Sequence, residues 1–294
     1  MPLRHLLLVL AIIAVWAFNA VAIKWGVGEI PPLFMTLLRF IIVAIVMVPF
    51  TRISRRQVPL LIKLAFTFGL MHFSLLFMGM TFTDAGTAAI IVQLGTPFAM
   101  ILAVLFLGEK ISLLKVAGVI ISLSGMVFLS GSPSLNSIKG LIILLLSALG
   151  WAITNILIKQ NDGLKPGAIA GWMSLFSIPL VGLMSLLFEN HQLQALAHAS
   201  WKGWFAIWYS AILCSVIAYS LWYWLLKLYP VNKIIPFTLL SPALAIIFGV
   251  LFAGDQLDIY KIGGALLIIS GALFATFNPS QLLSYLRRNR KAAV

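Results

Sequence analysis

The chain has 294 residues, of which 62% are hydrophobic and only 9% are charged, with a mean hydropathy of +1.09. A soluble domain of this length needs far more charged surface, so the composition excludes an ordinary soluble protein and indicates a chain surrounded mostly by lipid. The formal net charge of +13 would suit a nucleic-acid-binding protein, but the basic residues lie in short segments between apolar runs and at the C-terminus. That distribution orients a membrane protein and argues against nucleic acid as a partner.

Apolar runs of about 20 residues recur along the chain, and each is long enough to cross a ~30 Å hydrocarbon core as a helix. The first run follows Arg4 and lacks a small-residue cleavage site, so we expect a retained span rather than a removed signal peptide. No nucleotide-binding loop or soluble domain interrupts the series, and no cofactor is expected. The sequence therefore predicts an all-α integral membrane protein with ten transmembrane helices, at residues 5–25, 32–50, 59–80, 86–107, 112–130, 139–159, 167–188, 202–227, 233–253 and 259–278.

Two motifs occur once in each half of the chain. The first is a lysine followed by two glycines, as Lys115-Gly118-Gly125 and, 146 residues later, as Lys261-Gly264-Gly271. The second is a tryptophan, an asparagine and a lysine, as Trp16-Asn19-Lys24 and again as Trp151-Asn155-Lys159. Two similar halves are typical of secondary transporters, because their two alternating states need near-equivalent modules.

The predicted organisation is a first repeat at 1–134, a second repeat at 135–280 and a basic tail at 281–294. Each repeat holds five predicted helices, and because five is odd the second repeat must enter the membrane from the opposite side. The fold class we expect is therefore two inverted five-helix repeats. The paired glycines are expected to allow close contact between helices.

The distribution of basic residues predicts the orientation in the membrane. With the N-terminus in the cytoplasm, fifteen of the 20 lysines and arginines fall in cytoplasmic segments and five on the outer side. This bias places both termini in the cytoplasm, with the tail on the anionic inner leaflet. The membrane that we expect is a bacterial cytoplasmic (inner) membrane. Glu109 then lies at a cytoplasmic turn and Asp255 at an outer turn, where each is expected to cap or tie helices.

Tryptophan in membrane helices prefers the headgroup level, whereas Trp16 and Trp151 fall near the middle of their spans. Asn19 follows Trp16 by three residues and Asn155 follows Trp151 by four, so each pair shares a helix face. An amide at this depth needs a partner or water, and it can serve either as packing between helices or as the wall of a substrate cavity. The repetition favours a cavity between the first and sixth predicted helices.

Two predicted helices contain a proline near their middle. Gln93 precedes Pro97 by one turn in the fourth helix, and Ser241-Pro242 lies similarly in the ninth. Proline removes a backbone donor and loosens a helix, and paired breaks point to the hinges and the substrate site of a transporter. Ordinary kinks without function are equally compatible with the pattern. Gln93 is a candidate substrate contact, and Pro97, Ser241 and Pro242 are candidate hinges.

His72 is the only histidine that lies inside a predicted span rather than at its first residue. Its charge changes near neutral pH, so it is a candidate for proton coupling and substrate contact, and the alternative is a neutral residue in a packed interface. No Asp or Glu lies deep in a span, which argues against a carboxylate relay for protons or sodium. Tyr219 and Trp222 of the eighth helix are candidates to line the cavity, although such aromatic residues also suit packing.

Arg39 and Lys24 are two of the basic residues that fall within predicted spans. Arg39 is about a third of the way into the second helix and must be paired, reach outward or face water. Structural anchoring is the favoured interpretation, and binding of a substrate carboxylate is the alternative. Lys24 lies close enough to the outer surface to reach it and is assigned a structural role. The single cysteine, Cys214, offers no disulfide and no thiolate metal site, so no metal is expected.

Five short motifs follow one another along the chain: Trp16-Ala-Phe-Asn19 with Lys24, Leu38-Arg39-Phe40, Gly108-Glu109, Trp151-Ala-Ile-Thr-Asn155 with Lys159, and Ala218-Tyr219-Ser-Leu-Trp222. Their order and spacing over the whole chain resemble the EamA-type members of the drug/metabolite transporter superfamily. The resemblance implies a ten-helix inverted-repeat fold with cytoplasmic termini and a central cavity lined by helices 1, 3, 4, 6, 8 and 9. The tryptophan-asparagine pattern looks most like the branch that exports amino acids and their metabolites, including O-acetylserine and cysteine. The chain departs from the family at Gly254-Asp255-Gln256, where the family has Gly-Glu, so a tie formed there differs because Asp is shorter.

We expect an exporter of small polar or zwitterionic metabolites, such as amino acids or their derivatives, that works by alternating access as a monomer or homodimer. A cavity without fixed carboxylates suits neutral or zwitterionic cargo better than cations. Broad efflux of apolar drugs is the alternative, favoured by the aromatic content. An enzyme is not expected, because deep carboxylates, clustered histidines and paired cysteines are missing, and a channel would need a charged ring or filter-like loop. The substitutions Asn19→Ala and Asn155→Ala are each expected to abolish transport without lowering the membrane yield.

Overall fold

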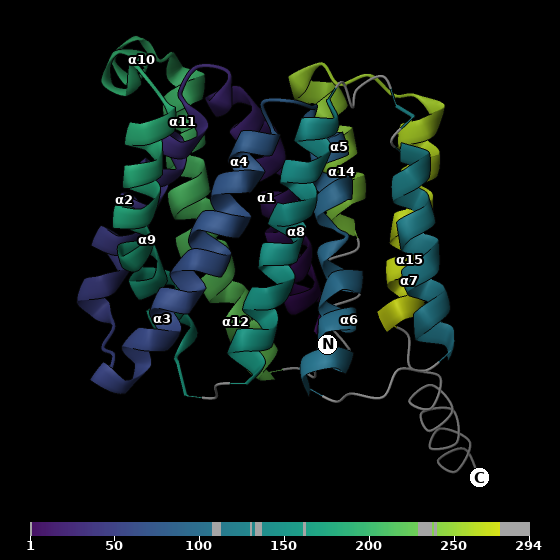
Figure 1. The fold of residues 1–294 in the computed structure, drawn as a ribbon, viewed down its shortest axis with the longest axis horizontal. Coiled ribbons are helices and arrows are strands. Elements are labelled where there is room, and N and C mark those ends of the chain that lie inside the picture. Colours follow the sequence, from purple (N-terminus) through teal and green to yellow (C-terminus); the bar gives the residue numbers. More distant parts are fainter. Residues whose placement is uncertain are drawn as a thin grey trace.

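The computed structural model describes residues 2–107, 113–129, 131–132, 137–160, 163–228, 237 and 240–276. Every regular element among these residues is a helix, and most of the helices run along one common axis (Figure 1). The prediction of an all-α protein is confirmed. Glu109 and the basic tail lie outside the described residues.

The described residues of the first half form eight helices, one of which is a π-helix that joins two others. They are α1 (Leu3–Val27), α2 (Pro32–Met47), α3 (Val58–Leu64), the π-helix η3 (Ala65–Ser74), α4 (Leu75–Gly79), α5 (Ala85–Val92), α6 (Gly95–Leu107) and α7 (Leu113–Leu129). Two short 3-10 turns, η1 (Val48–Phe50) and η2 (Arg55–Gln57), connect α2 to α3. Because α3, η3 and α4 follow without a gap, they form the single long helix predicted as the third span.

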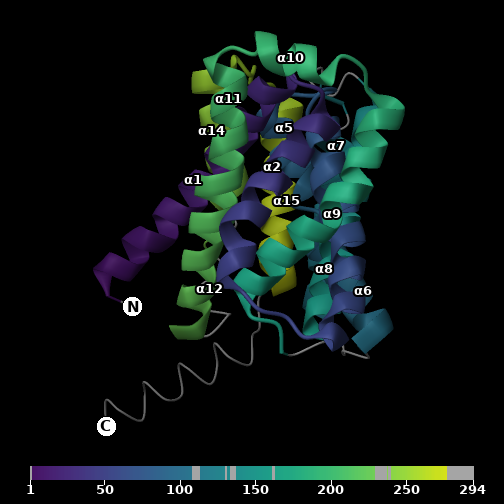
Figure 2. The same ribbon diagram turned by 90° about the vertical axis from the view of Figure 1, so that its left-hand side faces the viewer.

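The described helices of the second half repeat much of this order. They are α8 (Ile138–Lys159), α9 (Pro166–Phe188), α10 (Gln192–His198), α11 (Trp201–Trp208), the π-helix η4 (Tyr209–Ala218), α12 (Tyr219–Leu228), α14 (Leu240–Phe248), the π-helix η5 (Gly249–Ala253) and α15 (Ile259–Thr276). The short α10 lies across one end of the bundle, opposite the N-terminus (Figures 1 and 2).

In the part of the chain that the structure describes, seven helical stretches are long and apolar enough to cross a membrane, and they coincide with the predicted spans one to four and six to eight. Three shorter apolar helices, Val116–Leu129, Leu240–Ala253 and Ile259–Gly271, fall where the other three spans are predicted. The outer surface of the bundle is apolar: Leu3 and Leu7 on the projecting first turns of α1 are 70% and 56% exposed (Figure 2). The chain is thus a multi-pass membrane protein, and the inverted ten-helix arrangement remains a prediction.

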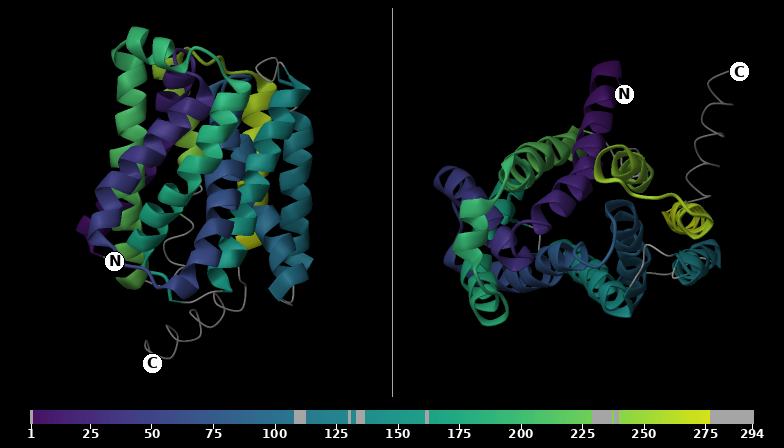
Figure 3. Two further views of the ribbon diagram at one scale, coloured as in Figure 1. Left: turned by 60° about the vertical axis from the view of Figure 1, so that its left-hand side comes forward. Right: turned by 90° about the horizontal axis from the view of Figure 1, so that it is seen from above.

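Helices α7 and α15 lie side by side at one edge of the bundle (Figures 1 and 3). A Cβ atom added to Gly271 would lie 2.5 Å from the Ser122 backbone nitrogen and 2.6 Å from the Gly118 carbonyl oxygen. A Cβ atom on Gly125 would lie 2.8 Å from the Ile268 backbone nitrogen. These repeated glycines do allow the close backbone contact expected of them.

The glycine contact gives a prediction for stability. Gly271→Ala places a methyl group against backbone atoms that no rotamer change can move, so we expect it to destabilise the protein by about 1–3 kcal/mol. Gly182→Ala is the matched control, because its Cβ atom would lie 3.7 Å from the nearest atom, Leu37 Cδ1. Thermal unfolding in detergent should show a lower Tm for Gly271→Ala alone. Equal Tm values for the two variants would contradict the close contact.

The third and eighth predicted spans each contain a π-helix, and both π-helices are ten residues long. In η3 the Ser74 hydroxyl donates to the Gly69 carbonyl over 3.1 Å, and in η4 the Ser215 hydroxyl donates to the Ser210 carbonyl over 2.8 Å. Each serine therefore bonds five residues back, which is the spacing of the widened turn. The two segments begin 144 residues apart, so the widened turn is a feature that both halves share. Such segments frequently mark functional sites.

Candidate functional site

Trp16 lies close to two other aromatic candidate residues, Tyr219 and Trp222, where α1 meets α12. Its ring centroid lies 5.0 Å from that of Tyr219 and 5.2 Å from that of Trp222. The indole Nε1 of Trp16 is buried and has no hydrogen-bond partner. A buried donor without an acceptor costs free energy, so this nitrogen is available to a bound solute or a water molecule.

Asn19 lies one turn further along α1 and contacts η4. Its side-chain oxygen accepts a 2.7 Å hydrogen bond from the Ser210 hydroxyl. On the same face, the Tyr209 hydroxyl donates to the Val15 carbonyl over 3.0 Å. These bonds join the first half of the chain to the second at the depth where the sequence predicted a cavity. Ser210 and Tyr209 were not among the candidates, because a single serine or tyrosine in an apolar run carries no signal.

Trp151 and Asn155 have different surroundings from their counterparts. Trp151 packs against α6, where a Cβ atom added to Gly95 would lie 2.8 Å from the indole Cε3 atom. Asn155 is exposed, and its amide donates to the Trp151 carbonyl of its own helix over 2.8 Å. Among the described residues, no ring contact or side-chain hydrogen bond joins this pair to Trp16 or Asn19.

The fourth predicted span is interrupted at its middle. Helix α5 ends at Val92 with Gln93 as its C-cap, and α6 begins at Gly95. Pro97 is buried in the first turn of α6, where a backbone N–H has no helical partner and its absence costs little. In the second half, Ser241 and the buried Pro242 lie near the start of the described part of α14. The hinge role of these residues stays a prediction.

His72 lies in η3 and is buried against α8. Its Nδ1 atom is 3.0 Å from the Ser147 carbonyl oxygen, and the Ser147 hydroxyl donates to the His72 carbonyl over 2.8 Å. The imidazole stacks on Phe68 at a centroid distance of 5.2 Å. This geometry is that of a hydrogen-bonded residue in a packed interface. Arg39 is also buried, in α2, and both its Nε and Nη2 donate to the Ser215 hydroxyl oxygen.

Five acidic side chains accept hydrogen bonds at the end of the bundle opposite the N-terminus (Figure 1). We refer to them as the carboxylate layer: Glu29, Asp84, Glu189, Asp255 and Asp258. Each accepts a hydrogen bond from the other half of the chain. The donors are the backbone and hydroxyl of Ser200 for Glu29, Lys261 for Asp84, the Leu33 and Phe34 backbones for Glu189, the Gly86 backbone for Asp255 and the Ser132 hydroxyl for Asp258. These bonds hold the two halves together at this end.

The densest part of the carboxylate layer surrounds Asp84, which caps α5 by accepting from the Thr87 backbone over 2.7 Å. Lys261 is fully buried, and its ammonium donates to Asp84 Oδ2 and to the Gln256 carbonyl, each over 2.6 Å. Asp255 is bound to Asp84 through their side chains and accepts from the Gly86 backbone over 2.9 Å. The nearby Asp84 carboxyl disfavours ionisation of Asp255, and the Lys261 ammonium opposes that effect.

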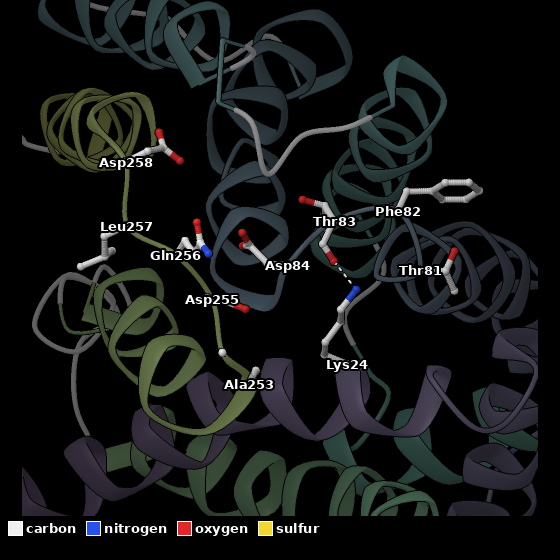
Figure 4. A pocket seen from close by; sticks show the side chains of 11 residues that line it. Lys24, Thr81, Phe82, Thr83, Asp84, Ala253, Asp255, Gln256, Leu257 and Asp258 are labelled. Carbon is white, nitrogen blue, oxygen red and sulfur yellow. Dashed lines mark hydrogen bonds between the residues drawn. The ribbon is translucent and has the colours of Figure 1, made fainter.

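A cavity of about 430 Å³ opens beside these residues (Figure 4). Lys24 lines it from α1 and donates to the carbonyls of Met80 and Thr83 over 2.8 and 2.6 Å. The cavity is also lined by Asp84, Gln256 and Asp258, so its wall is charged. Lys24 does not reach outward into solvent as a free ammonium, because two carbonyls hold it in place.

The pKa of Asp255 is raised, first because the carboxyl is buried and second because Asp84 is close, while the Gly86 N–H and Lys261 oppose the shift. A raised pKa means that Asp255 binds its proton more tightly in the folded protein than a free aspartate does. The stabilisation of the fold that protonated Asp255 contributes is therefore complete below the ordinary aspartate pKa of about 3.9. This stabilisation is lost as the pH rises through the raised pKa. Lys24, Asp84, Asp258 and Lys261 are the other titratable groups around this cavity.

The upward shift of the Asp255 pKa predicts the effect of Asp255→Asn, which keeps the side chain uncharged at every pH. We expect the Tm of the wild type to fall below that of Asp255→Asn as the pH is raised from acid to neutral, because only the wild type must ionise a buried carboxyl. Paired thermal unfolding curves across this range measure the difference. A difference that does not change with pH, or that grows in favour of the wild type, would contradict the raised pKa of Asp255.

Comparison with known proteins matches both halves of the chain. The sequence model of the EamA-like transporter family matches residues 3–131 and 138–277. The uncharacterized transporter YoaV of Bacillus subtilis is 27% identical over 93% of this chain and 97% of its own length. A probable amino-acid metabolite efflux pump of Salmonella typhimurium is 29% identical over 92% of this chain and 94% of its own length. A crystal structure with 20% sequence identity superposes with a TM-score of 0.63 and covers 92% of this chain and 95% of its own, which shows a shared fold.

Proposed function

Because the chain belongs to the EamA-like transporter family of the drug/metabolite transporter superfamily, we propose that it exports small polar or zwitterionic metabolites, with amino acids and their derivatives as the main class. The observation that carries this proposal is the family match over both halves of the chain. The similarity to a probable amino-acid metabolite efflux pump along nearly the full length supports the substrate class. The family is one of transporters, and no catalytic role is proposed.

Alternating access is the mechanism that we propose for the export. It requires two halves that part at one membrane face while they close at the other. The carboxylate layer supports this, because its bonds run between the halves and lie at one end of the bundle. In the proposed cycle these bonds break when the site opens at that end and re-form when it closes.

The orientation that we propose places the carboxylate layer on the outer face of a bacterial inner membrane. The opposite end holds exposed basic side chains, in the segments that follow α2 and α8 and in α3, namely Arg52, Arg55, Arg56, Lys63 and Lys165. Basic residues of short loops remain in the cytoplasm, so the N-terminus lies there as well. The arrangement described is therefore closed toward the outside.

The binding site that we propose lies where α1 meets η4 and α12. Trp16 and Tyr219 supply aromatic surface, and the unpartnered Trp16 Nε1 and the Asn19 amide supply polar groups. Polar donors beside aromatic rings suit a solute that has a charged or polar end and an apolar side chain. Gln93, His72, Trp151 and Asn155 remain candidate contacts from the other helices.

Counterflow in proteoliposomes tests the proposed function. Purified protein should accumulate labelled amino acids from a metabolite panel, and unlabelled amino acids should compete, whereas apolar drugs should not. Broad drug efflux is the competing transporter function, favoured by the aromatic residues around Trp16. Accumulation of apolar drugs that amino acids fail to inhibit would replace the proposed substrate class with that one.

A further inference from the structure

Arg39 is a buried charge that none of the ion pairs in the described part of the chain accounts for. It lies at the middle of α2 and is only 2% exposed, with its guanidinium carbon 3.8 Å from the centroid of the Phe73 ring. A second ring, Phe77, lies 5.7 Å away. A charged side chain at such depth is costly, and in transporters it is generally a functional residue.

The protein partners of Arg39 satisfy only part of its guanidinium. Nε and Nη2 share one acceptor, the Ser215 hydroxyl oxygen, over 3.1 and 2.8 Å. The Nη1 nitrogen is buried and has no hydrogen-bond partner. The Ser215 hydroxyl gives its own hydrogen to the Ser210 carbonyl, so it turns its oxygen toward the guanidinium. A neutral hydroxyl cannot balance the charge, which leaves a positive site with free donors.

No described carboxylate is free to pair with Arg39. All five of them lie in the carboxylate layer and are bonded there to other donors. The anion that fits the guanidinium must therefore come from outside the described protein. A carboxylate suits it best, because two oxygens match the parallel N–H donors of Nη1 and Nη2.

A short chain of hydrogen bonds joins Arg39 to the proposed binding site. Arg39 donates to Ser215, Ser215 donates to the Ser210 carbonyl, and the Ser210 hydroxyl donates to Asn19. The π-helix η4 makes this possible, because it places Ser210 and Ser215 on one face although they are five residues apart. Ser215 and Tyr219 also line a small cavity of about 30 Å³. This volume holds one water molecule, so a solute reaches Arg39 only when the two halves move apart.

We propose that Arg39 binds the carboxylate of the exported solute. The inference rests on the proposed function and deepens it, because it restricts the substrates to small organic carboxylates, amino acids among them. Ser215 holds the guanidinium in position, and Asn19 and Trp16 contact the remainder of the solute. Arg39 thus acts as the specificity-determining residue rather than as a structural anchor.

The test compares a carboxylate with its neutral amide, using L-cysteine and L-cysteinamide in counterflow with wild type, Arg39→Gln and Arg39→Lys. Wild type should transport L-cysteine with a kcat/KM about 100-fold above that of the amide. Arg39→Gln should remove this preference by lowering kcat/KM for L-cysteine about 100-fold while leaving the amide within about threefold. Arg39→Lys keeps the charge but loses the planar fork, so its preference should be intermediate.

The outcomes separate the inference from the function on which it rests. An equal loss of both substrates in Arg39→Gln, or no preference in the wild type, overturns the inference alone. Wild-type protein that transports no amino acid overturns the proposed function and the inference with it. Should Arg39→Gln fail to fold, wild-type thermal unfolding gives the answer: L-cysteine should raise the Tm more than L-cysteinamide does, and equal shifts overturn the inference.

Discussion

Lys261→Met is expected to lower the Tm sharply and to abolish transport. The ammonium is fully buried and lies 2.6 Å from Asp84 Oδ2, so its removal leaves the Asp84 carboxylate without its ion-pair partner. Breaking a buried ion pair by removing one partner costs about 3–5 kcal/mol. Thermal unfolding and counterflow of the same preparation measure the two effects.

A second substitution identifies the cause of this loss. Asp84→Asn combined with Lys261→Met removes both charges, and asparagine still caps α5, so the double variant should recover most of the lost stability. Lys139→Met is the control for losing a lysine at the same end, because that side chain is exposed, and its Tm should equal that of the wild type. A double variant no more stable than Lys261→Met would show that the Asp84 charge is not what Lys261 balances.

Asn19→Ala is expected to abolish transport, with a loss of at least about 100-fold, while the protein reaches the membrane in normal yield. The amide lies between the aromatic cluster of Trp16 and the Arg39–Ser215 pair, where the proposed solute makes its polar contacts. Asn155→Ala is predicted to abolish transport as well, although its side chain bonds only its own helix among the described contacts. Counterflow normalised to membrane yield measures both variants.

Ser210→Ala is the matched variant for Asn19, because it removes the hydroxyl that Asn19 accepts from but leaves the amide in place. If Asn19 contacts the solute, Ser210→Ala should keep transport within about tenfold of the wild type. Equal losses in the two variants would mean that Asn19 serves as packing between α1 and η4. That was the alternative which the sequence left open.

The helical spans and the glycine contact could be predicted because composition and spacing determine them. A run of apolar residues must be helical in lipid, and glycines at repeated positions mark where backbones approach, as at Gly271. Asp84 also carried a readable signal: an aspartate that precedes an apolar run by one residue is a typical helix N-cap. Its role in joining the halves was still invisible, because Lys261 lies 177 residues away.

The polar partners inside the bundle could not be predicted from the sequence. The π-helix η4 has no compositional marker, yet its widened turn is what aligns Ser210 with Ser215. For the same reason, the serine that holds Arg39 could not be chosen among many others in the apolar runs. The repeated Trp–Asn motif predicts similar surroundings in the two halves, whereas Trp16 lies against aromatic rings and Trp151 packs against α6. Equivalent sequence positions in the two halves need not have equivalent neighbours.

Double electron–electron resonance, which measures the distance between two spin labels, tests alternating access most directly. In a Cys214→Ala background, one pair of labels at Thr81 and Leu257 spans the cavity of the carboxylate layer, and a second pair at Arg56 and Lys165 spans the opposite end. When a transported amino acid is added, the account predicts that the first distance lengthens in the same population in which the second shortens. Two distances that stay fixed in transporting protein, or that lengthen together, would contradict it.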